Sequence, residues 1–236
     1  MTPPLSLAPP LSLVEGSFDA WAAARNRVLS SAAKRIPAAS AASQGRALGL
    51  WHQGEVRVAN DAQFDLFLDL GVFGPVGGHT PALEREARAG EHDFDEARML
   101  DAMRAARFHL FRVLGPHPEG GVAAEDLLSA AALRIEDRML ARPERVGRGF
   151  AGRLMEAGGA RMTCGALAGL SEAAVGELLG FVHVIGESPP ELPPLPPLSE
   201  ADVAGLRALA GEADFPARVY RASLRQGLMG NLPAPA

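Results

Sequence analysis

The sequence predicts an α+β protein that has N-terminal helices, a small antiparallel sheet or partly closed barrel, and a C-terminal helical tail. Three observations predict this class. Apolar residues recur at spacings of three and four over residues 17–107, the period changes to two from Phe108 onward, and a segment with six prolines precedes the last predicted helices. The chain has 236 residues, of which 47% are hydrophobic and 22% charged, so it suits one globular domain with a small appendage.

These patterns divide the chain into successive segments. We expect a disordered arm over residues 1–16, a helical region over 17–107, a strand-rich module with a closing helix over 108–187, a proline-rich linker over 188–198, and a helical tail over 199–236. Because polyproline offers few backbone donors, the linker is expected to be an extended spacer. The tail should then be dispensable for folding.

The helical region begins with a helix that Ser17 can cap and that ends before Pro37. Residues 37–45 are small and polar, which is typical of a linker. Residues 48–58 are expected to form a short hairpin or extended segment that turns at Gly54. The first helix is expected to serve packing, and Trp51 is expected to anchor the extended segment.

Further helices are expected where a capping side chain precedes an apolar pattern. Asn60 can cap the first of them, Thr80 followed by Pro81 the second, and Asp93 the third. Each of these helices carries apolar residues on one face. Their expected role is packing.

The strand-rich module begins at Phe108, where alternating side chains indicate a strand buried on much of both faces. Ser171 can cap the closing helix, and Ser199 with Asp202 makes a capping box at the start of the tail. Four or five short strands at this spacing suggest a small antiparallel sheet or a partly closed barrel. The later strands are expected within residues 121–128, 133–137, 149–156 and 160–164.

Charge and cysteine content restrict the compartment and the partners. The formal net charge of −5 gives no overall attraction for nucleic acid or for an anionic membrane. Cys164 is the one cysteine, which excludes an intramolecular disulfide framework and fits a reducing compartment. The sequence shows neither a charged signal-peptide start nor about 18 consecutive apolar residues. We therefore expect a cytoplasmic protein that binds neither nucleic acid nor membrane, with its oligomeric state left open.

One region concentrates side chains that could ligate a divalent metal. Its histidines and acids are His79, Glu84, Glu91, His92, Asp93 and Asp95. A metal-assisted hydrolase that uses the His79 to Asp95 region is therefore the alternative function. However, His92 and Asp93 are adjacent and no H-E-x-x-H spacing occurs, so an acidic solvated loop is the favoured interpretation. The sequence predicts no metal and no cofactor.

Charge is distributed unevenly along the chain. Residues 60–101 contain ten acids and three arginines, net −7, whereas residues 134–153 contain six arginines and three acids, net +3. The basic stretch is expected to contact acidic helices of the same chain or a protein partner, and not nucleic acid. Its candidate interaction residues are Arg138, Arg142, Arg145, Arg148 and Phe150.

These observations favour a non-catalytic cytosolic protein-interaction or adaptor protein whose partner is unidentified. Apolar and proline-rich features are abundant in the sequence, while a nucleophile elbow of the form G-x-S-x-G is absent from it. Cys164 lies in a strand that should be buried, where a thiol acts as a small hydrophobe. An enzyme remains the alternative.

The stretches FDLFLDL at residues 64–70, LER at 83–85 and AARFHLFRV at 105–113 follow one another along the chain. In this order they resemble a loosely defined bacterial family of uncharacterised proteins, in which a helical front half leads into a small strand-rich module. The resemblance covers roughly residues 48–180. It implies the mixed architecture predicted above, and it implies no particular activity.

Overall fold

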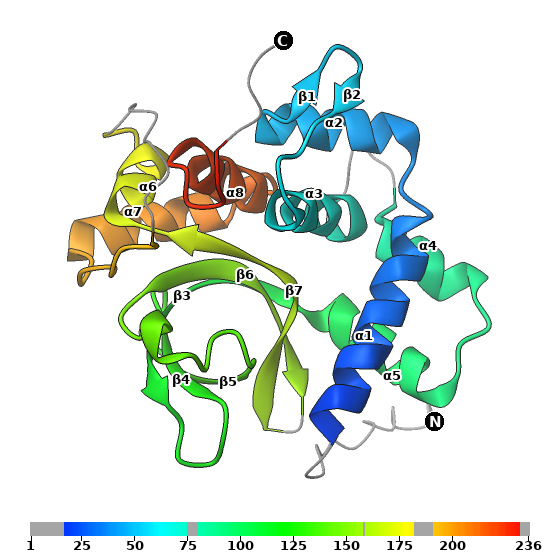
Figure 1. Cartoon of the computed structure of the whole chain (residues 1–236), viewed down its shortest axis with the longest axis horizontal. Coiled ribbons are helices and arrows are strands. Elements are labelled where there is room, and N and C mark those ends of the chain that lie inside the picture. Colours follow the sequence, from blue (N-terminus) through cyan, green and yellow to red (C-terminus); the bar gives the residue numbers. More distant parts are fainter. Residues whose placement is uncertain (1–16, 75–79, 158, 182–190, 232–236) are drawn as a thin grey trace, which may run out of the picture.

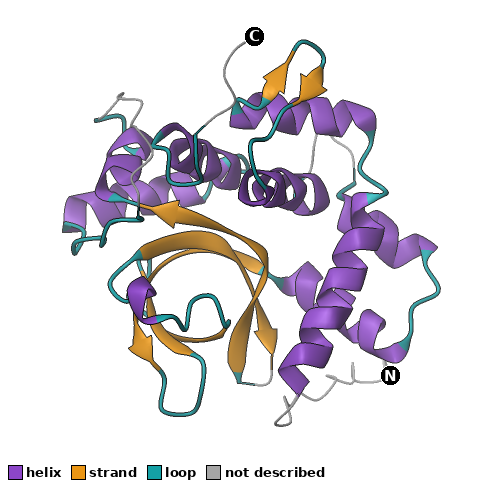
Figure 2. Ribbon diagram, in the orientation of Figure 1, coloured by secondary structure: helices purple, strands orange, loops and turns teal. Residues whose placement is uncertain are grey.

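The computed structural model describes residues 17–74, 80–157, 159–181 and 191–231 (Figure 1). These residues form eight α-helices and two β-sheets, so the α+β class predicted from the sequence is confirmed. Helices from both ends of the described chain cover a five-stranded barrel from above and from the right in the view of Figure 2. The expected arm over residues 1–16 lies outside the described residues.

Five helices and a two-stranded hairpin precede the barrel. Their apolar faces pack as the sequence predicts, and one buried cluster joins Val28 of the first helix to Met99 of the fifth and to Met155 of the barrel. In chain order these elements are α1 (Ser17–Ala33), α2 (Ala38–Leu48), β1 (Trp51–His52), β2 (Glu55–Val56), α3 (Asp61–Phe73), α4 (Ala82–Ala89) and α5 (Phe94–Ala105).

Residues 37–45 do not form the expected linker, because most of them belong to α2. The stretch is rich in alanine, which has the highest helix propensity of all residues. Pro37 is the N-cap of this helix, and Gly49 ends it with a φ of 77°, a left-handed conformation that glycine adopts without strain. The hairpin expected around Gly54 is present and follows directly.

Predicted capping side chains begin several helices. Asn60 and Asp93 each accept a hydrogen bond from the backbone N–H three residues further on, at the starts of α3 and α5. Thr80 does not cap α4, because the N-cap of that helix is Pro81, whose ψ of 149° places it before the first turn. The Thr80 carbonyl instead accepts a hydrogen bond from Arg85 Nε at 3.0 Å.

The strand-rich module is a five-stranded barrel in which the pairing follows the order β3-β4-β5-β7-β6 and returns to β3. The β5–β7 pair is parallel and short, with two residue pairs in register. The sheet is therefore mixed and not antiparallel throughout, because an odd number of strands cannot alternate in direction around a ring. The strands are β3 (Arg107–Pro116), β4 (Val122–Asp126), β5 (Ala132–Glu136), β6 (Gly149–Ala157) and β7 (Ala160–Leu170).

The barrel interior is apolar, and the loop between β5 and β6 covers one end of it. Leu140 of this loop is 2% exposed and packs among the interior side chains. The loop then forms a short 3-10 helix, Pro143–Arg145, before β6 begins. The buried interior cluster consists of Phe111, Val113, Val122, Ala124, Leu133, Ile135, Leu140, Phe150 and Leu154.

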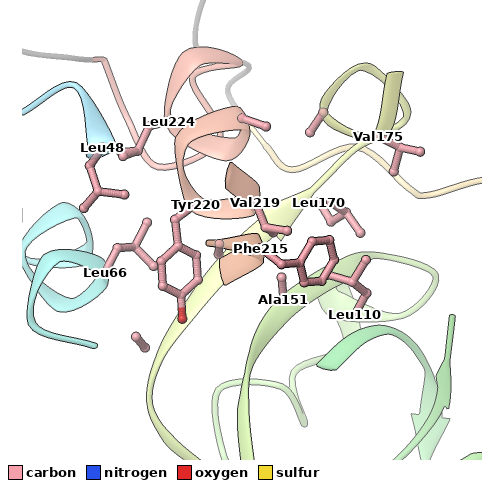
Figure 3. Close-up of a cluster of buried hydrophobic side chains, with 14 of the residues drawn as sticks. Leu48, Leu66, Leu110, Ala151, Leu170, Val175, Phe215, Val219, Tyr220 and Leu224 are labelled. Atoms are coloured by element: carbon pink, nitrogen blue, oxygen red, sulfur yellow. The ribbon is translucent and has the colours of Figure 1, made fainter. Parts of the chain in front are cut away.

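The C-terminal helices pack onto the barrel and do not form a separate tail. Tyr220 of α8 (Phe215–Arg225) is completely buried in a cluster that also includes residues of α2, α3 and the barrel. Figure 3 shows Val219 and Tyr220 beside Leu66 of α3 and Ala151 of β6. The expectation of a tail set apart from the core is therefore wrong, because the apolar face of α8 completes this cluster.

The described part of the proline-rich segment is a packed strap and not a free spacer. Leu195 is buried, and its backbone N–H donates a hydrogen bond to the β5–β6 loop at 2.9 Å. Pro194 forms a β-bridge with Arg148. Apolar leucines between the prolines supply this packing. The strap leads from the region after α6 (Glu172–Leu178) to α7 (Glu200–Ala210).

Candidate functional site

Acidic side chains of the predicted metal region are paired with arginines. Glu84 accepts hydrogen bonds from Arg104 at 2.8 and 3.0 Å. Burial alone would raise the pKa of Glu86, but hydrogen bonds from Arg35 and Ser31 lower it below its ordinary value. These carboxylates hold α4 against its neighbours.

The other members of that region do not gather around one point. His92 Nε2 lies 3.2 Å from the Glu86 carbonyl oxygen, whereas Asp93 caps α5 and lies 3.5 Å from Arg27. In the part of the chain that the structure describes, no group of three His, Cys, Asp or Glu side chains could hold a metal ion. His79 lies outside the described residues.

The candidate interaction arginines lie on the β5–β6 loop, which the structure presents to solvent. Arg138 pairs with Asp19 at 2.8 Å, and both side chains are largely exposed. Arg148 pairs with Glu191 of the proline-rich strap at 3.0 Å. Arg142 is also exposed. Two of these arginines therefore have partners within the chain, and neither partner belongs to the acidic stretch of residues 60–101.

Phe150 belongs to the barrel interior and not to the loop surface. It is 6% exposed, and its ring centroid lies 6.0 Å from that of Phe111. The guanidinium carbon of Arg145 lies over the Phe150 ring, 5.8 Å from its centroid. The structure thus brings Arg145 and Phe150 together, but it leaves no aromatic face of Phe150 for a partner.

A pocket that the sequence did not reveal lies between α1, α3 and β7, and we call it the α1–α3–β7 pocket. Its volume is about 510 Å³, within the roughly 300–1,000 Å³ typical of small-molecule sites. Leu29, Leu68 and Val72 give it apolar walls. Its charged lining residues are Arg25, Asp65 and Asp69.

An irregularity in the pairing of β6 with β7 shapes one wall of the pocket. The register shifts between Gly152 and Leu154, so that residues 164–166 of β7 lie opposite Arg153. Such bulges re-aim side chains out of the regular ladder and are frequent beside binding sites. Gly165 within the bulge has a φ of 117°, a conformation that favours glycine.

Arg25 reaches from α1 to this irregular part of β7. Its Nη1 donates a hydrogen bond to the Thr163 carbonyl at 2.9 Å. Its Nε and Nη2 donate to the Asn26 side chain at 3.3 and 3.2 Å. Burial lowers the pKa of the Arg25 guanidinium, because loss of water disfavours its charge. The guanidinium is therefore held in place at the pocket and is only partly solvated.

A buried ion pair beside the pocket joins α3 to β6. Asp69 Oδ2 lies 3.1 Å from Arg153 Nε, and the two side chains are 2% and 13% exposed. The Arg153 guanidinium carbon also lies 4.9 Å from the Phe73 ring centroid and 5.7 Å from that of Phe108. Burial raises the pKa of Asp69, and the charge of Arg153 opposes this shift without cancelling it.

One oxygen of this buried carboxylate lies beside the Tyr220 hydroxyl without a well-formed hydrogen bond. Asp69 Oδ1 and the Tyr220 hydroxyl are both buried without a hydrogen bond of ordinary geometry to any described residue. Burial, together with the nearby charge of Asp69, raises the pKa of Tyr220 well above its ordinary value. Buried polar atoms without partners are rare in folded proteins, and each one calls for an explanation.

The same pocket collects further groups with displaced pKa values. Burial and the charge of Asp61 raise the pKa of Asp65. Burial and the charge of Asp69 raise the pKa of Cys164 to about 12. Cys164 is 2% exposed, so its predicted burial is confirmed. A cleft in which several pKa values are displaced is typical of a functional site.

The sequence contains one signal for this pocket. Asp61, Asp65 and Asp69 recur every fourth residue on α3, which is mostly apolar apart from Gln63, so they share one helix face. A row of carboxylates on one face of a mostly apolar helix indicates that this face has a role in addition to packing. Within the net negative charge of residues 60–101, however, the stripe does not stand out.

Fold and pocket together define a helix-covered five-stranded barrel with a cleft of small-molecule size at its side. A family model described as a family of unknown function (DUF7986) matches residues 27–179. The chain belongs to this family, and the resemblance to an uncharacterised family is confirmed. No curated protein and no solved structure matches the chain. Among the described helices, none has the length and apolar character needed to cross a membrane.

Proposed function

We propose that the chain is a non-catalytic protein-interaction or adaptor protein that docks a protein partner through the β5–β6 loop. The observation that carries this proposal is a set of exposed large apolar side chains on the loop and the neighbouring end of β3. Leu114 is 51% exposed, Met139 50% and Val146 46%. Apolar side chains with arginines around them are typical of protein-binding surfaces.

The loop presents these side chains on a fixed frame. Met139 is exposed next to Leu140, which is anchored in the barrel interior. The Gly147 backbone N–H donates a hydrogen bond to the Val113 carbonyl of β3 at 2.8 Å, which fixes the backbone that carries Val146 to the strand that carries Leu114. A surface that is ordered before binding loses little conformational freedom when a partner docks.

A protein partner suits this molecule better than nucleic acid. Five-stranded Greek-key barrels include the OB-folds, whose second and third strands bind oligonucleotides. The corresponding strands here are β4 and β5, and they carry Glu125 and Glu136 on their outer side. Arg134 on the same side already pairs with Glu119 and Glu136. Arg112 of β3 likewise pairs with Glu125, so the arginines of this face are already neutralised by carboxylates and offer little to phosphate.

We also infer a bacterial origin and a cytoplasmic location. Lys34 is the single lysine among 23 basic residues, a skew toward arginine that a GC-rich coding sequence produces. The single cysteine, Cys164, is buried as a free thiol, which suits a reducing compartment. Both inferences rest on composition and burial.

The metal-assisted hydrolase has less support, because Glu84 and Glu86 already pair with arginines and Asp93 caps a helix. Elemental analysis of the purified protein tests it. One metal ion per chain that disappears in a His92→Ala variant would favour the hydrolase over the adaptor.

Affinity capture with matched variants tests the docking surface. The wild-type chain is compared with the double variant Leu114→Ser/Val146→Ser and with Val58→Ser, a control outside the barrel whose valine is 36% exposed. A protein captured by the wild type is then purified, and its affinity is measured for all three chains. We expect the double variant to bind at least about tenfold more weakly and the control to bind like the wild type. Equal affinity for the three chains would contradict the proposal.

A further inference from the structure

We propose that the α1–α3–β7 pocket binds a small zwitterion with an apolar body, namely an apolar amino acid or a short apolar peptide. This site is formed by other elements than the β5–β6 loop, so the inference does not depend on the docking function. It rests on two features of the pocket: opposite charges at its rim and apolar walls.

The opposite charges at the rim belong to Arg25 and Asp65. Both residues line the pocket, yet no ion pair or hydrogen bond joins them among the described residues. The hydrogen bonds of Arg25 go to Asn26 and Thr163, which leaves at least one guanidinium N–H for a ligand carboxylate. A ligand with an anionic and a cationic end would satisfy both rim charges at once.

The acceptor for the cationic end is the Asp65 carboxylate on α3. The Asp65 side chain is exposed at the pocket and accepts no hydrogen bond from any described residue, whereas Asp69 Oδ1 is fully buried and out of reach of a ligand there. An ammonium group has three N–H donors, so it can donate to Asp65 and to water at the rim. Partial burial also raises the pKa of the Asp65 carboxyl group, which a bound cation would reverse.

The remaining walls suit an apolar body. Leu29, Leu68 and Val72 line the pocket, and Phe64 stands 44% exposed at its edge. Burial of an aliphatic side chain against these residues contributes roughly 25 cal/mol per Å² of apolar surface removed from water. The volume of about 510 Å³ accommodates a single amino acid with room for a second residue.

The balance of charge favours a zwitterion over a simple ion. Asp69 is already opposed by Arg153, and Asp137, which opposes the charge of Arg25, is not among the lining residues, so Arg25 and Asp65 are the positive and the negative group that a ligand meets. A simple anion would meet the Asp65 carboxylate, and a simple amine would leave the free N–H of the partly desolvated Arg25 without an acceptor. A molecule without net charge but with both ionic groups avoids both penalties.

Calorimetric titration of the full chain tests this proposal with L-leucine and the dipeptide Leu-Leu as probes. N-acetyl-leucine, which lacks the ammonium, and leucine amide, which lacks the carboxylate, are the matched controls. We expect at least one of the two zwitterions to bind, and each single-charge control to bind at least about tenfold more weakly.

Variants at the rim assign the binding to this pocket. We expect Asp65→Asn and Arg25→Gln each to weaken zwitterion binding by about tenfold or more. Asp61→Asn, one turn earlier on the same helix and outside the pocket lining, should change the affinity by less than about twofold. Arg25 also donates a hydrogen bond to β7, so Arg25→Gln could unfold the protein, and the melting temperature of each variant is therefore recorded. If Arg25→Gln is unfolded, the result for Asp65→Asn alone decides the test.

Three results would overturn the proposal. Absence of binding by both zwitterions would remove the ligand. Equal binding of leucine, its amide and its N-acetyl derivative would show an apolar pocket without charge recognition. Binding that Asp65→Asn leaves unchanged would place the ligand elsewhere. None of these results bears on the β5–β6 loop, so the proposed docking function would stand or fall separately.

Discussion

Two buried aspartates, Asp126 at the end of β4 and Asp69 on α3, differ in how their charge is compensated. Asp126 accepts hydrogen bonds from His109 Nδ1 at 2.7 Å and from the Ser129 backbone N–H at 2.8 Å. Burial alone would raise the pKa of Asp126, but these hydrogen bonds lower it to about 2. Asp69 pairs with Arg153 through Oδ2, its Oδ1 lies beside the Tyr220 hydroxyl without a hydrogen bond of ordinary geometry, and burial raises its pKa.

The two carboxylates differ in whether their hydrogen bonding is complete. Both carboxylate oxygens of Asp126 have donors within the chain, and together they fasten the turn between β4 and β5. Asp69 lines the α1–α3–β7 pocket, but its Oδ1 is buried beside the Tyr220 hydroxyl without a hydrogen bond of ordinary geometry. A buried acceptor without a well-formed hydrogen bond costs about 1–3 kcal/mol, a cost that Asp126 does not have. The surroundings of Asp69 are therefore the less complete of the two.

The contrast between Asp126 and Asp69 assumes that α8 is part of the fold that buries Asp69. It would not hold if the region around Asp69 folded without α8. We expect truncation after Gly186 to abolish cooperative unfolding, because it removes α8 and with it the buried Phe215, Val219 and Tyr220. Thermal unfolding followed by circular dichroism measures this effect. A sharp transition in the truncated chain would show that α8 merely rests on a core that is complete without it.

Removal of the Asp69 carboxylate should have the next largest effect. In Asp69→Ala the guanidinium of Arg153 stays buried without its counter-charge, which costs about 3–5 kcal/mol of unfolding free energy. Urea unfolding at neutral pH measures the loss. Asp65→Ala is the matched control one turn earlier, and it should change stability by less than about 0.5 kcal/mol. A loss in Asp69→Ala no larger than in this control would mean that Arg153 finds another partner.

Substitution of Asp126 should give a smaller and pH-dependent loss. Because the folded pKa of about 2 lies below the ordinary value of 3.8, the carboxylate stabilises the fold where it is ionised. We expect Asp126→Asn to lose about 2 kcal/mol at pH 7. The difference from the wild type should persist down to a pH of about 4 and vanish as the pH falls through about 2. Unfolding free energies measured across this range would refute the assignment if the difference stayed constant.

Tyr220→Phe should have the smallest effect on stability. It tests whether the Tyr220 hydroxyl stabilises the Asp69 carboxylate. Because the Tyr220 hydroxyl is buried without a hydrogen bond of ordinary geometry, its removal should leave stability unchanged or raise it by up to about 1 kcal/mol. Denaturant unfolding of the variant beside the wild type checks this. A loss above about 1 kcal/mol would mean that the hydroxyl donates to Asp69 and that the carboxylate is better satisfied than the structure indicates.

Local rules predicted much of the fold. Caps such as Asn60 and Asp93 and the hairpin at Gly54 follow from side chains that act on their own neighbourhood, so the sequence identifies them. The α2 helix was missed because small residues read equally as linker and as helix. β7 extends to Leu170, beyond its predicted end at Cys164, because strand pairing with β6 carries it through two glycines.

The candidate pocket could not be predicted because it is assembled from distant parts of the chain. Arg25 and Thr163 are in hydrogen-bond contact although 138 positions separate them in the sequence. The uneven charge did predict contacts of the basic stretch within the chain, and Arg153 with Asp69 links it to the acidic one. Spacing alone does not say which of the six arginines makes that link.

The family match has limits that differ from those of the folded unit. The matched residues, 27–179, begin in the middle of α1 and stop just after α6. Yet α8, which supplies Tyr220 to the wall around Asp69, lies wholly beyond the match. The segment that identifies the family is therefore shorter than the segment that forms the packed core. A comparison restricted to residues 27–179 would leave out one side of the environment that gives Asp69 its character.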